Sequence, residues 1–315
     1  MGKDRSEESQ KNIDYFDMLP EGCIAEIVSH TTPADACHVA LVSTTFHSVA
    51  DSDPVWNTFL PSDYRQFLSR AVENQPIHHV LRSSPSNKDL YLSLSDHPLI
   101  IDSASMSFSL DKWTGKKCFM MAASTLTIVW GDTPRYWRWT SDLESRFGKV
   151  IELISVCWFE IHGRISTSLL SGDTAYTTYL VYKPATTISG FEDLPLEISV
   201  GIIGEESIKR NVFVDPEGGV QRKNFSIPRR LGLFHNFRAS HPRAQVALPL
   251  NVDRQYPRTR KDGWLELELA QYFNKEGENR DLEISLLEVK GGNWKSGLII
   301  QGIEIRPMGV LRGTV

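Results

Sequence analysis

The sequence predicts an α+β protein in which a small helical unit precedes a larger antiparallel β-sandwich. Apolar residues recur at helical spacing over roughly the first hundred positions. From about Phe108 onward the period changes to two, which is typical of strands with one face in water. Clusters of glycine and proline separate most of the later apolar runs. This punctuation favours short antiparallel strands arranged in a jelly-roll-like sandwich.

Residues 14–60 are predicted to form three or four short helices. Pro20 suits the first turn of a helix, and Thr32-Pro33-Ala34-Asp35 carries the cap, proline and acid of a helix start. Asp53-Pro54 begins the last helix, which Pro61 ends. The apolar positions of these helices are Ile24, Ile27, Val28, Val39, Val42, Phe46, Val49, Val55, Trp56 and Phe59.

This short helical segment has more apolar side chains than it can bury internally, because small units have much surface for their volume. It also carries seven acidic residues and no lysine or arginine between Asp14 and Leu60, whereas the rest of the chain is close to neutral. Such asymmetry indicates two modules with different partners. Either the apolar surplus packs on the rest of the chain, or it is presented to a partner protein.

The remaining organisation follows from composition. Residues 1–13 form a predicted disordered leader and residues 61–107 a helical connector, with helices around Tyr64–Leu68 and Leu90–Leu94. Residues 108–310 form the β-sandwich. Val150–Ile161, apolar on both faces, is predicted to be one central strand. The other predicted strands are Phe119–Ala122, Thr125–Trp130, Tyr136–Thr140, Tyr176–Tyr182, Leu196–Ile203, Val212–Val214, Trp264–Leu269, Leu282–Val289 and Leu298–Arg306.

Several classes of function are disfavoured. No apolar run approaches the length of a membrane span, and the first residues lack a secretory signal, so we expect a cytoplasmic and/or nuclear protein without membrane or nucleic-acid partners. The four cysteines form no C-x-x-C pair and are expected to be small buried hydrophobes. We find no nucleotide, hydrolase or metalloprotease motif, and therefore predict no catalytic residue, no metal site and no cofactor.

The N-terminal pattern resembles the F-box. The resemblance covers about residues 14–60, from Met18-Leu19-Pro20-Glu21 through the apolar stripe to Val55-Trp56. It implies docking to a Skp-type adaptor, and through it to the cullin and RING subunits of a ubiquitin ligase. Carried over by position, the residues at or near the adaptor interface are Leu19, Pro20, Ile24, Ile27, Val28, Val42 and Trp56. The alternative is that these residues pack on the C-terminal domain.

The C-terminal part resembles the phloem-lectin family, to which the tobacco lectin Nictaba belongs. The resemblance runs from about Phe108 to Pro307. Five ordered blocks carry it: Leu110–Met120, Leu126–Trp139, Val156–Gly163, Arg260–Glu266 and Asn293–Gly297. An F-box followed by such a domain is a known combination in plants.

The lectin resemblance implies a site for N-acetylglucosamine-containing glycans. A sugar site needs an aromatic plate for the apolar ring face and polar groups for the hydroxyls. Trp130 and Trp137 bracket a Gly-Asp-Thr-Pro turn and are the implied plates, and Asp281 and Glu288 are the implied acidic contacts. Positions seven apart on a regular strand face opposite sides, so these two acids can share a site only across a bulge or a preceding turn.

The other tryptophans are predicted to be structural. Trp158, Trp264 and Trp294 lie in or beside apolar runs and are expected in the core. Trp139 shares strand parity with Trp137, so both indoles face one side and can both be buried. His162 lies within a strand and is expected to be hydrogen-bonded structure.

Together these observations predict a non-catalytic substrate-receptor subunit of an SCF-type cullin-RING ubiquitin ligase. The F-box docks the adaptor, and the lectin-like domain recruits a protein client, with glycan recognition as one mode of recruitment. The alternative interpretation is a nucleocytoplasmic, stress-responsive carbohydrate-binding lectin that acts independently of the ligase.

Overall fold

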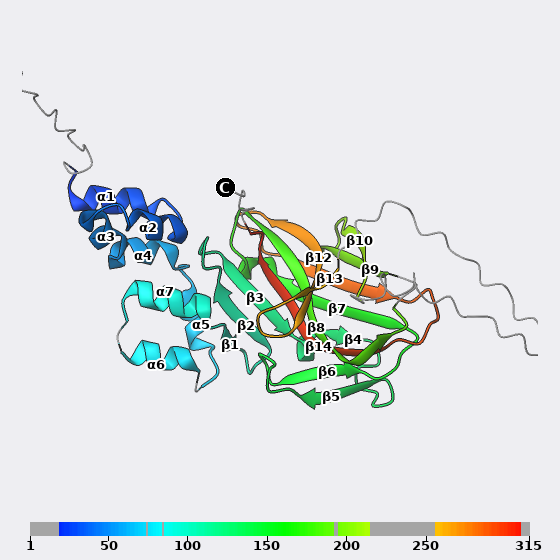
Figure 1. Ribbon diagram of the computed structural model, residues 1–315. Helices are drawn as coiled ribbons and strands as arrows, with labels where there is room; N and C mark the ends of the chain where they lie inside the picture. The colour runs from blue at the N-terminus through cyan, green and yellow to red at the C-terminus, as the bar shows by residue number, and fades with distance from the viewer. Residues whose placement is uncertain (1–18, 74, 84, 192–194, 215–255, 310–315) are drawn as a thin grey trace, which may run out of the picture. The chain divides into compact units, whose positions relative to one another are not determined.

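The computed structural model describes residues 19–73, 75–83, 85–191, 195–214 and 256–309. The chain divides into two compact units (Figure 1). Unit 1 comprises Met1–Asp102 and Phe108–Lys117, and unit 2 comprises Ser103–Ser107 and Cys118–Val315. The first unit is helical and the second is built from antiparallel sheets, so the predicted α+β class is confirmed.

Unit 1 contains the predicted short helices. At the start of α2 the side chain of Thr32 accepts a hydrogen bond from the Asp35 backbone, and the Asp35 carboxylate accepts one from the Thr32 backbone. The predicted reciprocal cap is therefore present. The helices are α1 (Glu21–Ser29), α2 (Pro33–Val39), α3 (Thr44–Ala50), α4 (Asp53–Phe59), α5 (Tyr64–Ser69), α6 (Pro76–Arg82) and α7 (Asn87–Asp96).

Aromatic side chains form the core of unit 1. The Trp56 indole is fully buried, donates to the carbonyl of Ala50 at 2.6 Å, and lies 5.1 Å from the Tyr91 ring. Phe67 of α5 stacks on Phe108 with ring centroids 4.3 Å apart. This contact explains why the residues after Phe108, predicted to begin the sandwich, belong to the helical unit.

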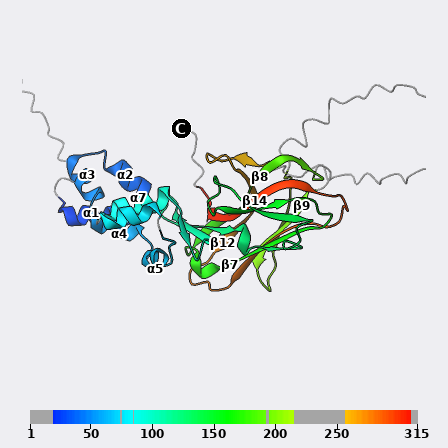
Figure 2. The same ribbon diagram turned by 90° about the horizontal axis from the view of Figure 1, so that it is seen from below.

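Unit 2 is a two-layered antiparallel sandwich (Figures 1 and 2). One sheet has the strand order β10-β9-β13-β7-β4, and the other runs β3-β14-β8-β12-β11 through this unit, with β6 paired to β14 and β5 to β6. Their bounds are β3 (Lys117–Ala122), β4 (Thr127–Ile128), β5 (Trp137–Ser141), β6 (Lys149–Leu153), β7 (Phe159–Ser166), β8 (Thr174–Ser189), β9 (Leu196–Ile202), β10 (Ile208–Val212), β11 (Arg258–Thr259), β12 (Leu265–Asn274), β13 (Asp281–Glu288) and β14 (Ser296–Pro307). Strand β1 (Leu99–Ile101) belongs to unit 1, and the boundary between the units falls within β2 (Met106–Leu110).

The prediction of one central strand over Val150–Ile161 was wrong. The segment forms the end of β6 in one sheet and the start of β7 in the other. Between them the chain leaves both sheets, and Val156 makes only an isolated bridge with Lys295. The segment is apolar on both faces because it crosses the core from one layer to the other, not because a single strand is covered on both sides.

The core of unit 2 lies between the two sheets. Along β7, Phe159, Ile161, Gly163 and Ile165 are buried, while the residues that alternate with them are partly or fully exposed. Phe159 lies 6.1 Å from the Trp137 ring and 5.4 Å from Phe191. The predicted alternation of inward and outward side chains is therefore present in this sheet.

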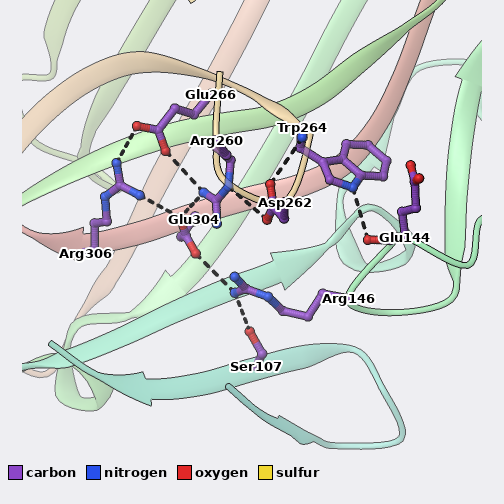
Figure 3. Close-up of polar contacts among 9 residues, drawn as sticks. All are labelled: Ser107, Glu144, Arg146, Arg260, Asp262, Trp264, Glu266, Glu304 and Arg306. Atoms are coloured by element: carbon purple, nitrogen blue, oxygen red, sulfur yellow. Dashed lines mark hydrogen bonds and ion pairs between the residues drawn. The ribbon is translucent and has the colours of Figure 1, made fainter. Parts of the chain in front are cut away.

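A buried network of arginines and glutamates ties the loops of unit 2 to its larger sheet (Figure 3). Glu304 of β14 pairs with Arg146 at 3.1 Å, Arg260 at 2.5 Å and Arg306 at 3.2 Å. Burial alone would raise the pKa of Glu304, but the charges of Arg146, Arg260 and Arg306 outweigh it and lower the pKa to about 2. Glu266 accepts from Arg306 and Arg260 at 2.7 and 3.2 Å. These carboxylates are charged, satisfied groups of the scaffold.

Two further expectations concern cysteines and membranes. Cys23 and Cys37 are exposed, so the prediction that all four cysteines are buried was wrong; both lie on the outer sides of short helices. Among the described residues, no helix combines the length and apolarity needed to cross a membrane.

Candidate functional site

Unit 1 exposes a set of aliphatic side chains even though its core is already formed. Leu41 and Val42, which follow α2, are 82% and 69% exposed, and Ile27 of α1 is 51% exposed. Leu19 and Pro20, at the start of α1, are also exposed. We call Leu19, Pro20, Ile27, Leu41 and Val42 the aliphatic face. Helices α1 and α2 contact one another, so these residues come from adjoining elements.

The other adaptor-interface residues named from the sequence lie inside unit 1. Ile24 and Val28 are buried on the core-facing side of α1, Ile27 lies at the edge of that side, and Trp56 of α4 is also buried. Their apolar spacing defines the helix stripe, and this stripe faces the core of the unit. They are therefore part of the core of unit 1 and not of the exposed aliphatic face.

Sequence reasoning missed Leu41, the most exposed aliphatic residue of unit 1. Leu41 lies in the turn between α2 and α3, where helical periodicity gives no information about direction. The usable signal was the Leu41-Val42 pair immediately before the Ser43 cap of α3, because two adjacent aliphatic residues in a turn cannot both point inward.

In unit 2, Trp130 stands at the surface in a strained backbone conformation. Its φ is +58°, in the left-handed region that bulky residues rarely adopt. The indole is 41% exposed and lies 5.3 Å from the Tyr136 ring. The next residue, Gly131, is closely packed, since a Cβ there would lie 3.0 Å from the Ile128 Cβ. Trp130 is thus an exposed aromatic residue on a constrained backbone.

Trp137 does not share this exposure. Its indole is 2% exposed and donates to the carbonyl of Val129 at 3.1 Å. Trp139, predicted to share the side of Trp137, is exposed and donates to the carbonyl of Gly131 at 3.2 Å. Trp130 is therefore exposed and Trp137 buried, and the second exposed indole beside the turn is Trp139.

The two acidic residues implied by the lectin resemblance lie at opposite ends of β13. The strand is paired in continuous register from Asp281 to Glu288, without a bulge. Seven residues of strand span roughly 23 Å. Asp281 is exposed, whereas Glu288 is buried against Lys295, a fully buried ammonium that also donates to the carbonyls of Cys157 and Asn293. The structure does not bring Asp281 and Glu288 into one site.

A different group of polar side chains meets on the solvent side of the five-stranded sheet, which we call the outer face. Glu160 accepts from the Trp158 indole at 2.6 Å and contacts Nε2 of His162 at 2.8 Å. Nδ1 of His162 lies 2.9 Å from the hydroxyl of Ser285 on β13. His162 lowers the pKa of Glu160, and the Trp158 hydrogen bond acts in the same direction.

The prediction that Trp158 and Trp294 belong to the core was wrong, whereas Trp264 is fully buried as predicted. Trp158 is 42% exposed, in the segment that crosses between the sheets, and Trp294 is 53% exposed, beside the bridge of Lys295 to Val156. Neither residue lies on a strand, so strand parity does not apply to them.

The contacts of Glu160, His162 and Ser285 have the order of a Ser–His–acid relay. Acyl transfer needs N–H donors for the developing oxyanion beside the nucleophile. Strand β13 is paired with β7 on one side and β9 on the other. Its backbone N–H groups next to Ser285 are therefore engaged in the sheet.

Comparison with known proteins finds family matches for both parts of the chain. The F-box domain model matches residues 16–58, and the phloem protein 2 model matches residues 116–307. F-box protein PP2-B1 of Arabidopsis thaliana is 40% identical, over 93% of this chain and 90% of that protein. The chain belongs to the F-box proteins with a phloem protein 2 domain. F-box protein PP2-B10 of the same plant is 40% identical over 99% of this chain and 100% of its own, and F-box protein SKIP3 is 35% identical over 98% and 94%.

Family membership gives the helical unit a general role. An F-box implies binding to a Skp-type adaptor in SCF complexes, and F-box proteins are in general non-catalytic subunits of them. Among solved structures, a Clostridium thermocellum xylanase 10B fragment superposes with a TM-score of 0.28 and 13% identity, covering 62% of this chain and 28% of that chain. This similarity is too low to support an inference.

Proposed function

We propose that this F-box protein is the substrate receptor of an SCF-type cullin-RING ubiquitin ligase, acting in the cytoplasm and/or nucleus. Unit 1 docks the Skp-type adaptor, and unit 2 recruits a protein client. Catalysis belongs to the partner subunits, and this chain contributes proximity between the client and the ubiquitin-transfer machinery.

The aliphatic face is the observation that carries the proposal. A helical unit that has already buried Trp56, Ile24 and Val28 gains nothing internally from leaving Leu41 and Val42 in water. Clustered exposed aliphatic residues on a soluble protein mark a surface that a partner covers. The excess of acidic residues in the same segment restricts the partner further, because it disfavours negatively charged surfaces.

The experiment is capture of the purified Skp-type adaptor by the full chain. An Ile27→Glu variant places a charge in the aliphatic face and is expected to abolish capture. Val72→Glu is the matched control, since Val72 is also exposed in unit 1 but lies outside this face. If Ile27→Glu captures the adaptor at wild-type strength while remaining folded, the docking proposal is refuted.

The role of unit 2 in binding a glycosylated client is a second part of the proposal. The exposed indole of Trp130, which lies beside the Tyr136 ring, supports it, because an exposed aromatic ring can stack on the apolar face of a sugar. The alternative role, a carbohydrate-binding lectin independent of the ligase, draws on the same residue. Deleting residues 14–60 distinguishes the two if unit 2 remains folded, since only the independent lectin would keep its cellular activity.

A further inference from the structure

The outer face of unit 2 carries a fixed arrangement of an indole, a carboxylate, an imidazole and a hydroxyl. Trp158, Glu160, His162 and Ser285 are joined by three hydrogen bonds of 2.6, 2.8 and 2.9 Å. These bonds connect the crossing segment before β7, strand β7 and strand β13. We propose that this group is a binding site for neutral glycans, distinct from the residues that the lectin resemblance implies. The inference rests on the proposed role of unit 2 in client recruitment.

The side chains of this group are hydrogen-bonded to one another before any ligand binds. Trp158 is 42% exposed, but its Nε1 is tied to Glu160, so the orientation of the ring is fixed before any ligand arrives. Glu160 is held in turn by His162, and His162 by Ser285. A site whose side chains are already ordered avoids the entropic cost of ordering them on binding.

The surface around this group is partly apolar and partly hydrogen-bonding. On the sheet, Glu160 pairs with Leu287 across β13, and the backbone N–H of Val129 donates to the carbonyl of Glu160 at 3.1 Å. His162 pairs with Ser285 on one side and with Thr127 on the other. Aliphatic and hydroxyl groups therefore flank the indole and the carboxylate. This mixture of apolar and hydrogen-bonding surface suits a ring with one C–H face and a rim of hydroxyls.

The acidic side chains of the outer face favour neutral over acidic sugars. Alternation on β7, β13 and β9 directs Glu160, Asp281, Glu283 and Glu197 to the outer face, against Arg164 of β7 and Lys209 of β10, which pairs with Ser199. Arg164 is already paired with Glu283 at 2.8 Å, and Glu197 is paired with Lys290. Each carboxylate oxygen of Glu160 is already engaged once, by Trp158 or by His162, and keeps a second lone pair for a sugar hydroxyl. Its negative charge repels a uronate or sulfate.

The test is binding of defined trisaccharides to the purified full chain at pH 7, by titration calorimetry. The probes are chitotriose, cellotriose and mannotriose as neutral sugars, and trigalacturonate as the acidic one. The expected result is that at least one neutral sugar binds at least tenfold more tightly than trigalacturonate. Trp158→Ala is expected to weaken that binding at least tenfold. Phe273→Ala is the matched control, as an exposed aromatic residue on the other sheet, and is expected to stay within twofold.

A second variant guards against a folding artefact. Glu160→Gln keeps the shape of the side chain and is expected to weaken neutral-sugar binding about fivefold while reducing the discrimination against trigalacturonate. Unchanged near-ultraviolet circular dichroism establishes that each variant is folded.

Three results would overturn the proposal. One is a wild-type chain that binds none of the sugars at millimolar concentration, and another is a Trp158→Ala variant that binds like wild type. The third is loss of binding in Trp130→Ala but not in Trp158→Ala, which would locate the site on the β4–β5 loop. None of these results affects adaptor capture, so failure of the glycan site is distinguishable from failure of the receptor function.

Discussion

The exposed apolar residues of α1 and the turn after α2 differ in kind from those of the outer face of unit 2, and the difference indicates two kinds of ligand. On α1 and in that turn they are aliphatic, with Leu41 and Val42 next to each other, although unit 1 also exposes the indole of Trp113 in the turn after β2. In unit 2 they include indoles with fixed hydrogen bonds, such as Trp158 on Glu160. Aliphatic surface without polar partners gains free energy only when a large apolar surface covers it, as in a protein interface. An indole beside a carboxylate suits a small polar ring.

The two units also differ in what stabilises them. Unit 1 depends on apolar packing around Trp56, whereas unit 2 contains buried ion pairs at Lys295 and Glu304. Substitutions in one kind of core should therefore respond differently to pH and charge from substitutions in the other.

Replacing Lys295 by Met should lower the free energy of unfolding of unit 2 by about 3–5 kcal/mol, because it leaves the Glu288 carboxylate buried without its partner. Denaturant unfolding followed by tryptophan fluorescence measures the change. The double variant Lys295→Met/Glu288→Gln removes both charges and should recover part of the loss. A single variant within 1 kcal/mol of wild type would show that the pair does not stabilise this unit.

Acid should destabilise unit 2 through Glu304. Its pKa is about 2 in the folded chain against an ordinary value of 4.5, so its stabilising contribution is complete above about pH 4.5 and is lost as the pH falls towards 2. The total loss is about 2–3 kcal/mol. Glu304→Gln should be less stable at pH 7 but lose less stability between pH 4.5 and 2. Equal slopes for the two proteins over this range would contradict the prediction.

Replacing Trp56 by Phe should lower the stability of unit 1 by about 1–2 kcal/mol, because it removes the hydrogen bond to Ala50 and part of the packed volume. Hydrogen exchange resolved by mass spectrometry can measure this loss separately for the two units. Faster exchange in α3 and α4 with unchanged exchange in β7 and β13 is the expected pattern. Equal acceleration in both units would mean that they do not unfold independently.

Replacing Leu41 and Val42 by Ala should change the free energy of unfolding by less than about 0.5 kcal/mol at each position, because both side chains are already in water. Thermal unfolding provides the measurement. A loss of 2 kcal/mol or more would indicate that these residues pack within the chain, and the aliphatic face would then lose its meaning as a docking surface.

The sequence predicted those features that depend on local chemistry. The Thr32–Asp35 cap, the Ile24 and Val28 stripe, and the change of period near Phe108 are encoded within a few residues of one another. Periodicity gives the buried side of a helix, but it does not reveal which of the remaining apolar residues gather at the surface. For this reason periodicity did not reveal that Leu41 is exposed whereas Ile24 is buried.

Features that depend on strand pairing could not be predicted. His162 and Ser285 are separated by 123 positions in the sequence and meet only because β7 and β13 pair in one register. Trp158 was misjudged because the crossing from β6 to β7 looks like one apolar strand in the sequence. Asp281 and Glu288 could be doubted from spacing alone, and the regular β13 places them at opposite ends.

We propose that the aliphatic face of unit 1 docks the Skp-type adaptor. The most direct measurement is the equilibrium affinity of the full chain for the purified adaptor, compared between wild type, Leu41→Asp/Val42→Asp and Trp158→Ala. The prediction is a loss of at least a hundredfold for the double variant in unit 1, with no change for the variant in unit 2. Wild-type affinity in the folded double variant would contradict the claim.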